Sequence, residues 1–88
     1  EVEVGEEKFN QIMAELGISG ASLAELKGLM VGGTIRLPAL LAWLILHGAD
    51  RELVLYKFRR LGLSDDTLAD NYANALVEVV SDGRNKRT

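Results

Sequence analysis

Hydrophobic residues recur at helical spacing along most of the chain, beginning at Phe9. The first stripe follows the spacing i, i+3, i+4 and i+7 and comprises Phe9, Ile12, Met13 and Leu16. Such spacing places all four side chains on one face, so it predicts an amphipathic helix that ends at Gly17. Glu6 and Glu7 fit its first turn, where the helix dipole favours acidic side chains.

A second, shorter stripe follows after a loop around residues 18–21. Ser22 precedes it, and Glu25 stands three residues later, which is the spacing of a capping box. The sequence therefore predicts a short helix that begins after Ser22 and ends at the Gly32-Gly33 pair. Its apolar members are Leu23, Leu26, Leu29 and Met30.

The segment from Pro38 to His47 is apolar on every face. A helix of this kind is buried on all sides, so we predict that it forms the centre of the fold. Either the other helices cover it, or a second copy of the chain covers its remaining face. His47 ends the segment, where an imidazole can interact with the last carbonyl groups of the helix.

Two further amphipathic helices are predicted in the second half of the chain. Asp50 caps a helix over about 51–61, and Ser64 caps the last one, which ends at Gly83. We therefore predict an all-α fold, a compact bundle of four to five short helices around the central helix at about 38–47. The predicted buried stripe of the last helix is Leu68, Tyr72, Ala75, Leu76, Val79 and Val80.

The 88 residues are enough for one domain. We interpret residues 1–5 as a flexible lead-in, residues 6–83 as a single helical domain, and residues 84–88 as a basic, disordered tail. The longest apolar stretch, residues 37–46, is about half the ~20 residues that a membrane span requires. With no cysteine in the chain, a cytoplasmic location without a membrane span is the expectation.

Candidate catalytic chemistry is sparse. The single histidine has no cysteine to accompany it, so neither a nucleophilic pair nor a transition-metal site is expected. Asp65, Asp66 and Asp70 lie close in sequence, but without the spacing of a calcium loop, and helix capping accounts for the first two. We predict that the protein is not an enzyme and uses no cofactor or metal.

The apolar surplus is the strongest indication of function. A non-enzymatic interaction domain for assembly or as an adaptor, self-associating as a homodimer, is the leading hypothesis. A protein partner other than a second copy is the other possibility, and the homodimer is the preferred one. The candidate apolar interface or core residues are Leu37, Leu40, Leu41, Trp43, Leu44 and Ile45.

The alternative hypothesis is a small regulator that binds nucleic acid. The net charge of −3 argues against binding through overall charge, so a local basic face would be required. A helix-turn-helix over residues 22–47 is disfavoured because its second helix would present apolar rather than polar side chains to the bases. The candidate basic face comprises Arg51, Lys57, Arg59, Arg60, Arg84, Lys86 and Arg87.

Overall fold

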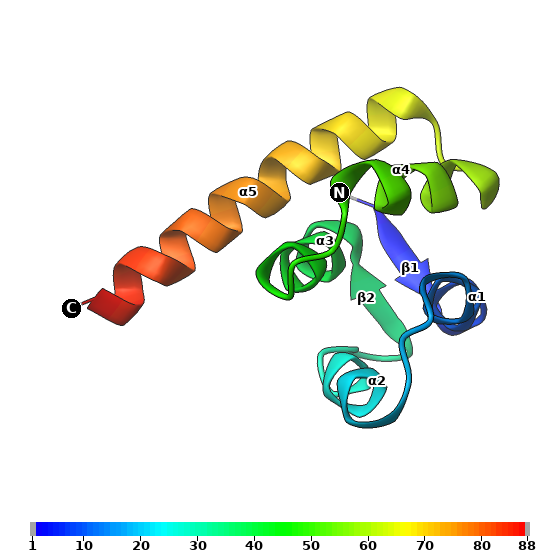
Figure 1. The fold of residues 1–88 in the computed structure, drawn as a ribbon, viewed down its shortest axis with the longest axis horizontal. Coiled ribbons are helices and arrows are strands. Elements are labelled where there is room, and N and C mark those ends of the chain that lie inside the picture. Colours follow the sequence, from blue (N-terminus) through cyan, green and yellow to red (C-terminus); the bar gives the residue numbers. More distant parts are fainter. Residues whose placement is uncertain (1, 88) are drawn as a thin grey trace.

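Five helices and one two-stranded sheet form the described part of the chain, residues 2–87 (Figure 1). The structure is a computed structural model, and it describes side chains up to residue 81. The predicted all-α bundle is confirmed, with the small sheet as an addition. In chain order the elements are β1 (Glu3–Gly5), α1 (Glu6–Leu16), α2 (Gly20–Lys27), β2 (Thr34–Arg36), α3 (Leu37–Leu46), α4 (Arg51–Arg60) and α5 (Asp65–Arg87).

Helix α3 is the centre of the core, as its all-round apolar sequence predicted. Helix α5 packs across it and makes the most extensive contact between any two elements of the described chain. The burial of α3 is therefore achieved within one chain, except at its last residue, Leu46, which is 55% exposed. The buried residues of α3 are Leu37, Pro38, Leu40, Leu41, Ala42, Trp43 and Leu44.

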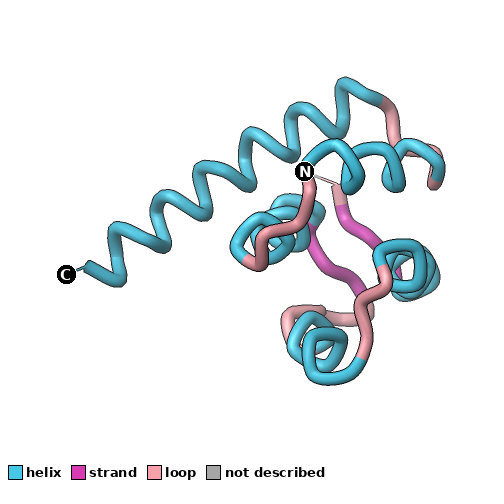
Figure 2. The backbone as a smooth tube through the Cα atoms, viewed as in Figure 1, coloured by secondary structure: helices cyan, strands magenta, loops and turns pink. Residues whose placement is uncertain are grey.

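The two strands tie the start of the chain to the start of α3. β1 lies beside β2 (Figure 2) and pairs with it in antiparallel orientation. Val4 and Ile35 face each other in this pair, and both are buried in the core. The Leu37 N–H continues the connection by donating to the Val2 carbonyl over 2.7 Å. Residues 3–5 are thus part of the folded domain, and their interpretation as a flexible lead-in was wrong. A three-residue strand has almost no local signal, because its stability comes from a partner far along the chain.

The start of α2 also differs from the prediction. The helix begins at Gly20, so Ser22 lies inside it, and no side chain caps its N-terminus. The predicted capping box is therefore wrong. Glu25 instead reaches α3, where its carboxylate accepts a hydrogen bond from the Trp43 indole.

The predicted caps of the last two helices are confirmed. The Asp50 carboxylate accepts from the Glu52 N–H over 3.0 Å at the start of α4. The Ser64 hydroxyl oxygen accepts from the Thr67 N–H over 3.2 Å at the start of α5. Both caps satisfy backbone N–H groups that have no partner inside the helix.

Helix α5 is longer than predicted. It continues past Gly83 to Arg87, because a single glycine costs a long helix only about 1 kcal/mol and each added residue closes another backbone hydrogen bond. The backbone of the predicted disordered tail is thus helical through residue 87, and residue 88 lies outside the described part. The side chains of Arg84, Lys86 and Arg87 are likewise outside it.

Replacing Leu44 with Asp tests the central position of α3. Leu44 is 2% exposed, so Leu44→Asp places an unpaired carboxylate in the core and should lower the free energy of unfolding by at least about 4 kcal/mol. Leu46→Asp, in the same helix but exposed, is the matched control and should cost less than about 1 kcal/mol. Urea unfolding followed by circular dichroism measures both; equal stability of the two variants would contradict the assignment.

Candidate interaction surfaces

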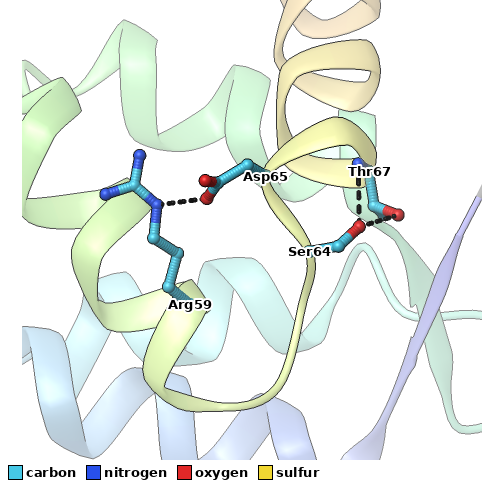
Figure 3. A network of polar contacts seen from close by, with 4 residues as sticks. All are labelled: Arg59, Ser64, Asp65 and Thr67. Carbon is cyan, nitrogen blue, oxygen red and sulfur yellow. Dashed lines mark hydrogen bonds and ion pairs between the residues drawn. The ribbon is translucent and has the colours of Figure 1, made fainter.

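The predicted basic face of α4 is divided between two neighbouring helices. The Lys57 ammonium forms an ion pair with the Glu15 carboxylate of α1, with 2.9 Å between nitrogen and oxygen. On another side of α4, the Arg59 guanidinium pairs with Asp65 at the start of α5, over 2.6 Å (Figure 3). Each pair joins two helices, so much of this positive charge is compensated within the fold.

The other two basic residues of α4 lie against aromatic rings. The Arg51 guanidinium stands 4.8 Å from the centre of the Tyr72 ring on α5. Arg60 and Lys57 flank Tyr56, each with its charge 5.9 Å from the ring centre. The structure therefore brings Lys57 and Arg60 together but directs Arg51 and Arg59 toward α5. Arg51 and Arg59 also border a recess together with Tyr56, so all four residues have Tyr56 as a neighbour, but much of their charge is already engaged within the fold.

The predicted apolar interface is the core of the protein. Five of its six members, Leu37, Leu40, Leu41, Trp43 and Leu44, are buried, and Ile45 is half-buried. Leu37, Leu40 and Leu41 are fully covered in the folded chain, so a partner cannot reach them. Of the two alternatives left open for this set, interface or core, the structure supports the core.

The end of α3 is held by a cluster of three side chains. The Trp43 indole N–H donates to the Glu25 carboxylate over 3.1 Å. The His47 ring stacks on the Trp43 ring with 3.7 Å between ring centres, and its Nδ1 lies 2.9 Å from the Trp43 carbonyl oxygen. The predicted interaction of His47 with the last carbonyl groups of the helix is thus confirmed. The cluster gives the partly buried indole a hydrogen-bond acceptor, which is a structural role.

A recess of about 440 Å³ lies beside this cluster. It is bordered by the α1–α2 loop, the end of α3 and the start of α4. Two of its polar side chains already have structural partners: His47 contacts a backbone carbonyl group, and Asp50 caps α4. Ser19 and Ser22, which carry hydroxyl groups, also border the recess.

Helix α5 carries two apolar stripes rather than one. Leu68 and Ala75 are buried against the core, with Tyr72 and Val79 half-buried beside them. Leu76 and Val80 were predicted to belong to this buried stripe, and that prediction was wrong. Three large apolar side chains of α5 stand in the open: Leu76 at 44%, Val77 at 64% and Val80 at 53% exposure.

The reason is the face of α5 on which these residues lie. They stand at the same level along the helix as Ala75 and Val79, but on the side turned away from the core. Only the end of α5 extends beyond the other elements (Figure 1). Residues 73, 76, 77 and 80 repeat at i, i+3, i+4 and i+7, displaced around the helix from the core stripe. The sequence therefore contains the signal for this stripe, because the helical spacing that predicts the core stripe also applies to it. The prediction merged the two stripes into one.

A second exposed apolar surface lies where α5 passes α3. A groove of about 440 Å³ is bordered by α3, α5 and the segment after α2. Leu29 and Leu46 stand on its rim and are about half-exposed, and Ala42 and Trp43 line it. Val77 also borders the groove, so it belongs to both exposed apolar surfaces.

The described residues offer neither a metal site nor a membrane span. Among their side chains, no group of three His, Cys, Asp or Glu is arranged to hold a metal ion. No helix in this part of the chain is both long and apolar enough to cross a membrane. The sequence matches no known protein family, and neither a curated protein nor a solved structure is detectably similar to it.

Removing the acceptor of the Trp43 indole should weaken the fold. Glu25→Ala leaves the half-buried N–H without its protein partner and should lower the free energy of unfolding by about 1 kcal/mol. Glu25→Gln retains an oxygen acceptor and should recover more than half of that loss. Urea unfolding followed by tryptophan fluorescence measures both, and wild-type stability of Glu25→Ala would show that the bond contributes nothing.

The ion pair between α1 and α4 should make stability depend on pH. The hydrogen bond and charge of Lys57 lower the pKa of Glu15 below its ordinary value, outweighing the desolvation that raises it. Because the folded-state pKa is depressed, the pair stabilises the fold above the unfolded-state pKa. This contribution is lost as the pH falls through the folded-state pKa.

Lys57→Met should therefore raise the pKa of Glu15, and it should destabilise the protein at neutral pH but not in acid. NMR titration of the Glu15 carboxyl group and urea unfolding at several pH values measure the two effects. Lys27→Met is the control, because Lys27 is exposed on α2 and should leave Glu15 unchanged. A pH-independent difference between wild type and Lys57→Met would refute the linkage.

Proposed function

We propose that this protein is a non-enzymatic interaction domain that self-associates through the exposed stripe of α5 and serves assembly in the cytoplasm. The observation that carries the proposal is the exposure of Leu76, Val77 and Val80 on one helix. Clustered exposed apolar side chains at helical spacing mark a surface that another helix covers. A second copy of the chain supplies such a helix.

The shape of the domain supports this proposal. Helix α3 is already covered within one chain, so folding itself does not require a partner. The apolar stripe of α5 is not needed for the core, which Leu68, Ala75 and the half-buried Tyr72 and Val79 already complete. An apolar stripe that the fold leaves unused is best explained by binding.

Nucleic-acid binding remains the second hypothesis, and no observation on the described residues favours it. Lys57 and Arg59 are engaged in ion pairs, and Arg51 lies over Tyr72. A patch that grips phosphates would need these charges free and on one face. Binding of generic DNA with an affinity that falls steeply with salt would revive this hypothesis.

Sedimentation equilibrium over a range of protein concentrations tests self-association. The wild-type chain should shift from monomer to dimer, and Leu76→Glu should raise the dissociation constant at least about tenfold by placing a charge in the contact. Asn74→Glu adds the same charge at an exposed position of α5 away from the stripe and should have little effect. A monomer at all concentrations would overturn the proposal.

A further inference from the structure

The two ends of α5 differ in charge, and the apolar stripe lies midway between them. Resting on the self-association proposed above, we infer that two copies pair through α5 in antiparallel orientation. The two-fold axis passes between Leu76 and Val77. Each copy then contributes the same surface to the contact, as a closed two-fold dimer requires.

The stripe is complementary to itself in this orientation. Residues at equal distances from the axis face one another, so Ala73 opposes Val80 of the second copy, and Leu76 opposes Val77. A small side chain thus meets a larger one at each outer position, which lets the two helices approach and pack closely. Ala69 and Ala73 are exposed, so the stripe is open to a partner toward the start of the helix as well.

The charges of α5 select the antiparallel orientation. Asp66 and Asp70 are exposed in the first two turns, whereas Asp65 is engaged by Arg59. After Ser81 the sequence carries three basic residues, Arg84, Lys86 and Arg87, against one acidic residue, Asp82. In an antiparallel pair the acidic end of each helix meets the basic end of the other, while a parallel pair would place like charges together. The opposed helix dipoles favour the same orientation.

The size of the stripe predicts how strong the pairing is. From Ala73 to Val80 it extends about 10 Å along the helix axis, at 1.5 Å per residue. A contact of this length falls at the small end of specific interfaces, for which about 1,000 Å² of buried area is the lower bound. The dimer should therefore dissociate on dilution rather than persist as an obligate unit.

Engineered disulfides can distinguish the antiparallel from the parallel orientation of the two α5 helices. The chain has no cysteine of its own that would interfere. In the antiparallel pair, position 73 lies beside position 80 of the second copy. Two copies of position 73 are then about 10 Å apart along the axis, beyond the ~7 Å limit between Cα atoms joined by a disulfide. In a parallel pair, each position would instead lie beside its own copy.

The experiment uses Ala73→Cys and Val80→Cys, alone and as an equal mixture, under mild oxidation. The antiparallel pair predicts a covalent dimer in the mixture at several times the yield of either variant alone. Asn74→Cys, exposed but off the stripe, gives the background when mixed with either variant. Efficient cross-linking of each variant alone would overturn the antiparallel orientation in favour of a parallel one.

The two proposals fail in different ways. If the wild-type chain is monomeric in sedimentation at every concentration, self-association itself is wrong. If the wild type dimerises but the mixture cross-links no better than the Asn74→Cys background, then only the antiparallel α5 contact is wrong. In that case the groove between α3 and α5 is the surface to test next, with Leu29→Glu as the variant.

Discussion

The burial of α3 is the constraint on which the rest of this structure depends. A helix apolar on every face cannot lie at the surface of a small domain, so other elements must enclose it. Helix α5 crosses it, and the paired strands hold its first turn through the bond from Leu37 to Val2. At the other end, the Glu25 carboxylate and the His47 ring hold Trp43 in place. These contacts are made within one chain, which leaves the surface of the domain available for binding.

The position of α5 at the edge of the domain decides which apolar side chains remain for a partner. Its inner face, with Leu68 and Ala75, packs against the core. A second stripe around Leu76 and Val80 lies on another face, and nothing in the described part of the chain covers it (Figure 1). The proposed dimer follows from this uncovered face, and not from an incomplete core.

The charged residues of α4 serve mainly to join helices. Lys57 connects α4 to α1, and Arg59 connects it to α5 beside the Ser64 cap (Figure 3). Partly exposed pairs of this kind contribute little stability each. Charges paired in this way are poorly placed to attract the phosphates of a nucleic acid. The exposed acids Asp66 and Asp70 have a different use in the proposed dimer, because they match the basic end of a second α5.

Local pattern determined the helices, their caps at Asp50 and Ser64, and the central position of α3, because periodicity and capping act within a few residues. Local pattern did not predict the strands, because Val4 pairs with Ile35, which is thirty-one positions away. Tertiary structure alone decided which apolar residues are covered: spacing placed Leu76 and Val80 beside Ala75 and Val79, but only the packing against α3 separates the two pairs. Tertiary structure also decided which basic residues form ion pairs. Lys57 meets Glu15, and Arg59 meets Asp65, only when α1, α4 and α5 come together. Sequence sets the face of a helix, whereas the fold sets what lies against it.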